Sequence, residues 1–225
     1  MVICCQKLVT YIYLKIYILV MNALDKLYRA YYAANKSKLY FSELKELTGL
    51  SNSSLQNALR KLESEKQILK LKEKSNTYYI LKNTKKTVFK FSEIDDERFW
   101  KLNRNVRAPI LDFLENFPKE IDFMILFGSA SRKKETEDSD IDLMVITHSF
   151  EDPDLQKRYR EEINQKLEYA KSKAESRAIY PLSIVAVELN YFLTSKDHIV
   201  EQAKLTGFPV FGHQNYHEVI LNVKR

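Results

Sequence analysis

Two short motifs separated by ten residues combine residue types that bind phosphates and divalent cations. Gly128-Ser129 follows the apolar run 123–127. A glycine without Cβ, next to exposed backbone N–H groups, lets a polyphosphate approach closely. Asp140 and Asp142 open a second apolar run, and residues two apart on a strand point to the same face. Adjacent carboxylates repel each other unless a cation lies between them. The motifs therefore predict a Mg²⁺ site beside a phosphate-binding turn.

The segments around these motifs predict an α+β fold with a small mixed sheet. Strands are predicted over 123–127, 140–146, 179–188 and 208–212, the last as a short edge strand, with a charged helix over about 154–173. Upstream, residues 95–107 predict a helix that ends where Ala108 meets Pro109, because the residue before a proline avoids the helical conformation. Pro109 then starts a second helix, which leads to the strand before Gly128.

Together, the two motifs resemble the signature of the nucleotidyltransferase superfamily, which includes the polymerase-β-like and minimal nucleotidyltransferase domains. The Gly-Ser pair, the spacer and the run Ser-Asp-Ile-Asp-Leu at 139–143 are similar to the small MNT antitoxins that are paired with HEPN toxins. Ser131-Arg132 also matches, whereas Lys133 stands where many members have glycine. The resemblance implies transfer of a nucleoside monophosphate from a nucleoside triphosphate to a hydroxyl, with Mg²⁺ or Mn²⁺ as cofactor.

The same resemblance gives roles to individual residues. It implies that Gly128 and Ser129 bind phosphates, and that Asp140 and Asp142 are the catalytic carboxylates and metal ligands. Two metal ions would hold the attacking and leaving oxygens and offset the charge that develops between them. Arg132 is the favoured candidate for a contact with the β- or γ-phosphate, and the alternative is a solvated loop charge.

A third carboxylate normally completes this type of metal site, from a later strand beside the aspartate pair. Where relatives often carry that acid, this chain has Leu182-Ser183-Ile184. Glu188 is the only acid on the strand, and it lies five residues after Ser183, so it is expected on the other face of the sheet. Two alternatives stay open: Glu188 is the third ligand, or the site has none and transfer is slow or absent.

The charge of the chain divides into a basic and an acidic part. Residues 36–90 hold 13 Lys and Arg against 5 Asp and Glu, a net charge of +8. Residues 120–162 hold 6 against 12, a net charge of −6. A basic module suits a polyanion such as DNA, and an acidic one suits cations and the nucleotide that they carry. The alternative is that the lysines only keep the surface solvated.

Residues 21–90 have the pattern of a winged helix-turn-helix. A short helix opened by Ser42, a turn at Thr48-Gly49 and a helix capped by Ser51 or Asn52 follow one another. Two strand-like runs, 68–71 and 77–81, then enclose a polar basic tip that suits a β-wing. The residues expected on the exposed face and leading edge of the second helix, where base edges and phosphates are contacted, are Asn52, Ser53, Gln56, Asn57, Arg60 and Lys61.

This segment resembles the winged helix-turn-helix DNA-binding domains of prokaryotic regulators. The resemblance implies DNA as a partner through the second helix and the wing. Winged helices also serve as protein docking modules, so docking or dimerisation stays open as the alternative.

The N-terminal region predicts a cytoplasmic protein without a membrane anchor. The apolar stretch 8–20 is interrupted by Lys15 and is shorter than the roughly 20 residues of a spanning helix. No small-residue cleavage site precedes Met21, so a signal peptide is not expected, and translation from Met21 is a hypothesis. Cys4 and Cys5 are adjacent and without zinc-site partners, which favours a reducing cytosol.

These observations predict four segments along the chain. Residues 1–20 are an N-terminal extension of doubtful status, and residues 21–90 form a winged helix-turn-helix. Residues 91–118 form a helical linker, and residues 119–225 form a nucleotidyltransferase domain. Two functional hypotheses survive. The first is a transferase that moves AMP from ATP, or another nucleoside monophosphate, onto a hydroxyl, with a partner protein such as a HEPN-type toxin as acceptor. The second is a DNA-binding regulator whose transferase-like domain senses nucleotide or is inactive. Either protein could form oligomers.

Overall fold

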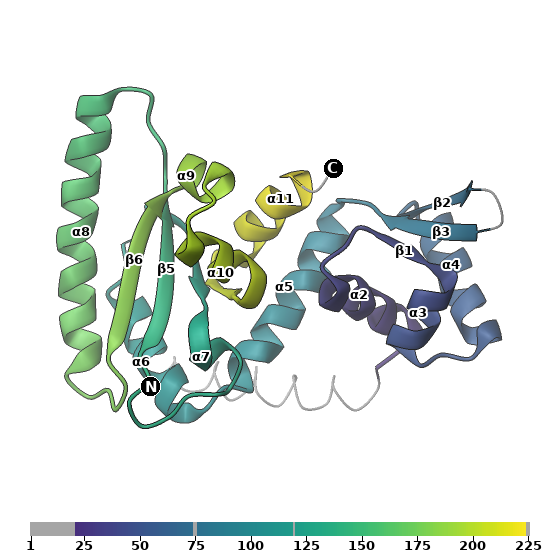
Figure 1. Cartoon of the computed structure of the whole chain (residues 1–225), viewed down its shortest axis with the longest axis horizontal. Coiled ribbons are helices and arrows are strands. Elements are labelled where there is room, and N and C mark those ends of the chain that lie inside the picture. The colour runs from purple at the N-terminus through teal and green to yellow at the C-terminus, as the bar shows by residue number, and fades with distance from the viewer. Residues whose placement is uncertain (1–20, 74–75, 119, 224–225) are drawn as a thin grey trace, which may run out of the picture. The chain divides into compact units, whose positions relative to one another are not determined.

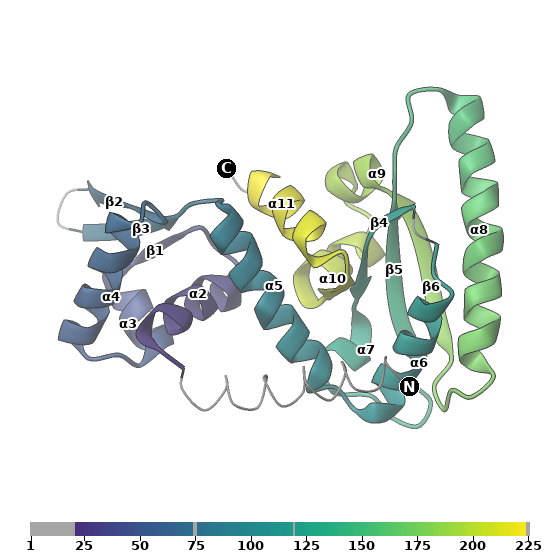
Figure 2. The ribbon, with the colours of Figure 1, turned by 180° about the vertical axis from the view of Figure 1, so that it is seen from behind.

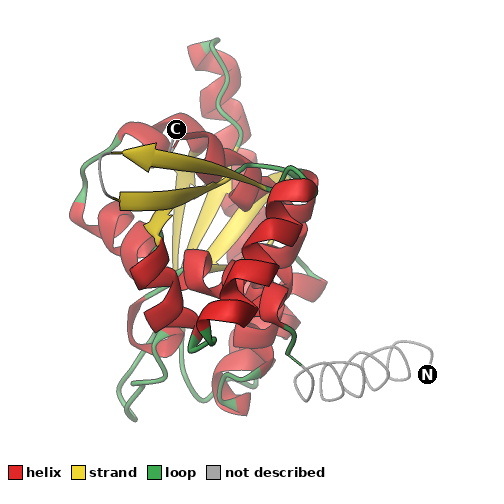
Figure 3. Ribbon diagram, turned by 90° about the vertical axis from the view of Figure 1, so that its right-hand side faces the viewer, coloured by secondary structure: helices red, strands yellow, loops and turns green. Residues whose placement is uncertain are grey.

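The computed structural model describes residues 21–73, 76–118 and 120–223, which belong to two compact units. Of these described residues, those from 21 to 97 and from 217 to 223 form the first unit, and those from 98 to 216 form the second (Figure 1). Figure 3 distinguishes the helices and strands by colour. Both units mix helices with small sheets, which confirms the predicted α+β class. In the part of the chain that the structure describes, no helix is long and apolar enough to cross a membrane. The N-terminal extension, including Cys4 and Cys5, lies outside the described residues.

The first unit contains helices on a three-stranded antiparallel sheet. Its elements are α2 (Ala23–Ala34), β1 (Lys38–Tyr40), α3 (Phe41–Thr48), α4 (Asn52–Ser64), β2 (Ile68–Glu73), β3 (Asn76–Leu81) and most of α5 (Lys85–Trp100). The strand order is β1-β3-β2, so β2 and β3 form a hairpin and β1 closes the other edge. The core consists of apolar side chains from all these elements, among them Leu27, Leu44, Leu55, Leu59, Ile68 and Phe91.

The turn between α3 and α4 is set by two residues. Gly49 follows α3 with a φ of 63°, in the left-handed region that glycine adopts readily, and its N–H bonds the Lys45 carbonyl. Ser51 caps α4, because its side chain accepts a hydrogen bond from the Ser54 N–H at 3.2 Å. Leu55, Leu59 and Leu62 of α4 are then fully or almost fully buried, which leaves the opposite side of the helix exposed.

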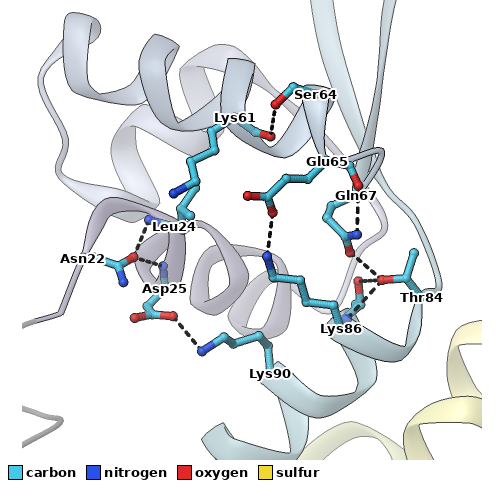
Figure 4. A network of polar contacts seen from close by, with 11 residues as sticks. Asn22, Leu24, Asp25, Lys61, Ser64, Glu65, Gln67, Thr84, Lys86 and Lys90 are labelled. Carbon is cyan, nitrogen blue, oxygen red and sulfur yellow. Dashed lines mark hydrogen bonds and ion pairs between the residues drawn. The ribbon is translucent and has the colours of Figure 1, made fainter.

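A polar network joins the ends of α2 and α4 to α5 (Figure 4). Lys86 on α5 donates to Glu65 at 2.5 Å, just after α4, and Lys90 on α5 pairs with Asp25 on α2 at 3.1 Å. The Glu65 pKa is lowered by its hydrogen bond with Lys86. The Lys86–Glu65 pair is largely exposed, and exposed ion pairs contribute little stability.

The C-terminal helix α11 (His213–Val223) returns the chain to the first unit. The His217 ring Nε2 lies 2.5 Å from one carboxylate oxygen of Asp95 on α5, and the Tyr32 hydroxyl of α2 bonds the other oxygen. Asp95 is completely buried and His217 is 4% exposed. Buried polar groups are stable only when they are hydrogen-bonded, so this contact makes α11 a constituent of the first unit's interior.

The second unit is built on a four-stranded mixed sheet. Its elements are the end of α5, α6 (Arg104–Glu115), β4 (Ile121–Leu126), α7 (Gly128–Ser131), β5 (Ile141–Thr147), α8 (Pro153–Glu175), β6 (Leu182–Glu188), α9 (Leu189–Thr194), α10 (His198–Thr206), β7 (Phe208–Phe211) and the start of α11. The strand order is β6-β5-β4-β7, in which β5 and β6 are parallel and the other two pairs are antiparallel. The small mixed sheet is therefore as predicted, with β7 at the predicted edge.

The two faces of this sheet carry different helices (Figure 2). Alternate residues such as Leu126, Leu143 and Leu182 pack with α6 and α8 in one apolar core. Phe123, from the opposite face, contacts Phe192 of α9 with ring centroids 5.7 Å apart. Because side chains alternate along a strand, Asp142 and Ser183 share the face that does not contact α6 and α8.

One predicted helix boundary is wrong. The break lies at residues 101–103, between α5 and α6, and Pro109 is inside α6 rather than at its start. Asn103 caps α6 by accepting a hydrogen bond from the Asn105 N–H at 3.0 Å, so the helix starts five residues before the proline. Pro109 removes one backbone hydrogen bond, but the packing of Val106, Ile110 and Phe113 in the core holds the helix together.

Candidate functional site

The Gly-Ser turn lies directly against the second aspartate. Gly128 has a φ of 70°, and a Cβ built on it would lie 2.0 Å from an Asp142 carboxylate oxygen. The Phe127 N–H also bonds the Asp142 carbonyl at 3.0 Å. Any larger residue at position 128 would therefore clash with the carboxylate in addition to being strained. The fold brings the two motifs of the sequence together at one end of β4 and β5.

The Ser131 side chain holds the turn in place. Its hydroxyl donates to the Gly128 carbonyl at 2.9 Å and lies 3.3 Å from the Thr206 carbonyl at the end of α10. Ser131 is buried, whereas Ser129 in the turn is partly exposed. Sequence reasoning gave Ser131 no anchoring role, because a small polar residue in a short turn has no pattern that predicts its partner.

The two aspartates lie at the start of β5. Asp140 is exposed and precedes the strand, and Asp142 is partly buried on it. Burial raises the pKa of the Asp142 carboxyl above its ordinary value, and the charge of Asp140 raises it further. A hydrogen bond from Ser183 and the charge of Arg132 act in the opposite direction. Carboxylate and hydroxyl oxygens are the ligands that Mg²⁺ and Mn²⁺ prefer, so this donor set fits a divalent cation.

The loop after the turn brings the charge of Arg132 close to Asp142. The N–H groups of Arg132 and Lys134 both bond the Ser129 carbonyl, at 3.1 Å each. Arg132 is exposed, and its charge acts on the Asp142 carboxyl. Lys133 has a φ of 56°, in the left-handed region. This conformation explains why a glycine suits the position and why lysine is an unusual choice there.

Ser183, and not Glu188, stands beside the aspartate pair. In the parallel register of β5 and β6, Asp142 pairs with Ser183, and Glu188 pairs with Thr147 at the other end of the strands. Glu188 forms an ion pair with Arg160 of α8. Within residues 21–73, 76–118 and 120–223, no three His, Cys, Asp or Glu side chains come together as a metal site. The structure thus separates Glu188 from the two aspartates.

The six residues predicted to contact DNA all lie exposed on α4. Gln56 and Arg60 line a cavity of about 700 Å³ that Lys70 and Asn76 of the hairpin also line. Lys61 is on the side of α4 toward Glu65, where its charge helps to lower the Glu65 pKa after the larger effect of Lys86. The exposed surface of α4 is thus polar and continuous with the hairpin.

Comparison with known proteins finds a family match for most of the second unit. Residues 109–205 match the family model described as polymerase beta, nucleotidyltransferase. This part of the chain is therefore a nucleotidyltransferase domain, and the match includes both the Gly-Ser and the Asp-x-Asp motifs, as predicted.

Two solved structures of toxin–antitoxin proteins are also similar to part of the chain. The crystal structure of a toxin–antitoxin MntA-HpeT mutant has 21% identity and a TM-score of 0.32, covering 51% of this chain and 80% of that chain. The crystal structure of a toxin–antitoxin with AMP-PNP has 23% identity and a TM-score of 0.31, covering 52% and 81%. No curated protein matches the chain.

Proposed function

We propose that this protein is a metal-dependent nucleotidyltransferase that moves a nucleoside monophosphate from a nucleoside triphosphate, AMP from ATP in the first instance, to a hydroxyl. The observation that carries the proposal is the contact between Gly128 and the Asp142 carboxylate. It puts the Gly-Ser turn next to the Asp142 carboxylate, so the phosphates of a nucleotide and a cation could be bound side by side. The nucleotidyltransferase match over residues 109–205 supports the same reaction class.

Each residue has a definite task in this proposal. Gly128 and Ser129 bind the phosphate chain through the turn, and Asp140 and Asp142 hold Mg²⁺ or Mn²⁺. The bound cation would offset phosphate charge and polarise the phosphorus that is attacked. Arg132 draws the terminal phosphates toward the turn, and Ser131 keeps the turn in place through the Gly128 carbonyl. The acceptor that we propose is a hydroxyl on a partner protein of the HEPN-toxin type, by the resemblance of the motif to MNT antitoxins.

Ligand-dependent thermal stability tests this proposal. We expect ATP with Mg²⁺ to stabilise the full chain by about 2.7 kcal/mol at 100 times the dissociation constant. The double variant Asp140→Asn/Asp142→Asn should lose that shift, because the cation would lose both charged ligands. The matched control is Glu188→Gln, which should keep it, since Glu188 lies at the other end of the strand. No shift with any nucleoside triphosphate would contradict the proposal.

A second proposal concerns the first unit, which we assign as a winged helix-turn-helix that binds DNA. The order α2-β1-α3-α4-β2-β3, with the Gly49 turn before α4 and a hairpin after it, supports this assignment. The exposed amides and cations of α4 supply the groups that base edges and phosphates require. The whole protein would then be a DNA-binding regulator whose transferase-like domain senses nucleotide. The rival role for the same surface is protein docking.

Separate variants distinguish the two functions. Asp140→Asn/Asp142→Asn should abolish nucleotide transfer and leave DNA binding unchanged, and Arg60→Ala/Lys61→Ala should do the reverse. Loss of both activities from either pair, in a protein that keeps its circular dichroism spectrum, would show that the functions are not divided between the units in this way.

A further inference from the structure

We propose that the nucleotide site holds one divalent cation rather than two, because Ser183 occupies the place where a second cation would need a carboxylate. This inference rests on the proposed function of the site. It goes further by stating the cation stoichiometry and by assigning that stoichiometry to Ser183.

The position of Ser183 follows from the strand register. Ser183 pairs with Asp142 across the parallel strands β5 and β6, and both side chains lie on the same face of the sheet. The register therefore puts the Ser183 hydroxyl next to the Asp142 carboxyl. Ser183 is therefore the β6 side chain best placed to add a ligand to the aspartate pair, and its hydroxyl is neutral.

The other acids near these strands have different roles. Glu188 is paired with Arg160 on the α8 side of the sheet. Glu175, at the end of α8, accepts a hydrogen bond from the Leu182 N–H at 2.9 Å and lies 3.9 Å from Lys171. Glu135, in the loop before Asp140, has one buried carboxylate oxygen for which the described residues supply no hydrogen-bond partner. Among the described residues, Glu135 does not join Asp140 and Asp142 in a group of three acids that could hold a metal ion.

Charge balance then favours a single cation. Two carboxylates neutralise one divalent ion, and Mg²⁺ is commonly bound by one or two carboxylates together with the phosphates of its nucleotide. Two cations separated by about 4 Å repel strongly and need a further negative ligand to offset that repulsion. Ser183 supplies none. We therefore infer a site that binds a nucleoside triphosphate with one cation firmly and transfers its nucleotide slowly.

Counting bound Mn²⁺ tests this inference independently of turnover. The full chain is titrated with MnCl₂ in the presence of a non-hydrolysable ATP analogue, and free Mn²⁺ is measured by electron paramagnetic resonance. We expect about one bound Mn²⁺ per chain for the natural sequence and about two for Ser183→Asp, whose carboxylate supplies the missing charge. Ser183→Ala should keep the count at one but weaken the affinity about tenfold, because the site loses the hydroxyl oxygen beside Asp142.

Two matched variants and one stability measurement complete the test. Glu188→Gln and Glu135→Gln should leave the count and the affinity unchanged. Ser183→Asp adds a third carboxylate to a crowded pair, so Mn²⁺ should raise its thermal midpoint more than that of the natural sequence. Two Mn²⁺ on the natural sequence, or a count that falls in Glu135→Gln, would overturn the inference while leaving the proposed function standing. An unchanged count in folded Ser183→Asp would also overturn it. No bound Mn²⁺ and no bound nucleotide would reject the proposed function and this inference together.

Discussion

Lys133 adopts a backbone conformation that is unfavourable for a residue with a side chain. Its φ of 56° lies in the left-handed region, which costs roughly 1–2 kcal/mol for residues other than glycine. Strain of this kind persists where the surroundings enforce it, and functional loops are frequent places. The loop therefore loses stability at Lys133.

This leads to a prediction for Lys133→Gly. The substitution should raise the free energy of unfolding by about 1 kcal/mol, because relief of strain exceeds the extra freedom that glycine has in the unfolded chain. Lys133→Ala is the control, since it removes the same charge and retains the strained backbone. Chemical denaturation measures both. Equal effects of the two substitutions would mean that charge, and not backbone strain, is what matters at this position.

Gly128 and Gly49 provide a matched pair for testing the contact at the site. Both have a positive φ, but a Cβ at Gly49 meets no atom within 4 Å, whereas at Gly128 it would strike Asp142. Gly49→Ala should cost about 1 kcal/mol from strain alone. Gly128→Ala should cost about 1–3 kcal/mol more from overpacking and should abolish the nucleotide-dependent thermal shift. Retention of the full shift in Gly128→Ala would argue against the proposed phosphate turn.

The buried Tyr28 hydroxyl should make the first unit less stable at alkaline pH. Burial raises the Tyr28 pKa to about 12, and its hydroxyl has no hydrogen-bond partner among the described residues. Below pH 10 the phenol is protonated in both states. Between pH 10 and 12 the unfolded chain ionises first, so stability falls as pH rises through this window.

Tyr28→Phe should therefore reduce the loss of stability between pH 10 and 12 and cost nothing at pH 7, since no hydrogen bond is lost. Tyr31→Phe is the control: its hydroxyl donates to the Tyr79 carbonyl at 3.1 Å, so it should cost about 1 kcal/mol at neutral pH. Urea denaturation at pH 7 and between pH 10 and 12 measures the free energy of unfolding of both variants. A larger cost for Tyr28→Phe than for Tyr31→Phe at pH 7 would contradict this account.

At the level of elements, alternation along strands made the site partly predictable. Because side chains alternate between the two faces of a strand, Asp140 and Asp142 were predicted on one face and Glu188 on the other. In the structure Glu188 does lie on the opposite face, where it pairs with Arg160. The pairing of Ser183 with Asp142 could not be deduced, because parallel register depends on contacts between segments distant in sequence. The capping role of Asn103 was also missed: Pro109 is a strong local signal, but packing of α6 in the core overrides it.

The α4 surface gives a prediction about salt. If α4 contacts DNA phosphates, Arg60→Ala/Lys61→Ala should reduce the slope of log affinity against log salt concentration by about 2, one for each contact. Fluorescence anisotropy with duplex DNA measures the slope. The control pair is Lys157→Ala/Arg158→Ala on α8, which removes the same charge from the second unit. Equal effects of the two pairs would mean that net charge, rather than this helix, governs the binding.

At the level of the whole molecule, the first unit depends on a segment that comes last in the sequence. Asp95 is buried and takes hydrogen bonds from Tyr32 and His217. His217→Ala should destabilise the first unit by about 2 kcal/mol or more, because a buried carboxylate loses one of its partners. Hydrogen exchange of α2 and α5 measures this effect. His198→Ala, on the exposed start of α10, is the control and should leave those helices unchanged. Unaltered exchange in His217→Ala would contradict the role given to α11.

The return of α11 also sets an order of events during synthesis. A ribosome that has released residues 21–97 has made a unit that lacks His217. This second partner of Asp95 emerges only after about 120 further residues, a delay on the order of 6–24 seconds at typical elongation rates. During this interval the nucleotidyltransferase segment, 109–205, can fold as a continuous piece of chain. Whatever the first unit binds, its finished surface becomes available only once the transferase domain has already been made.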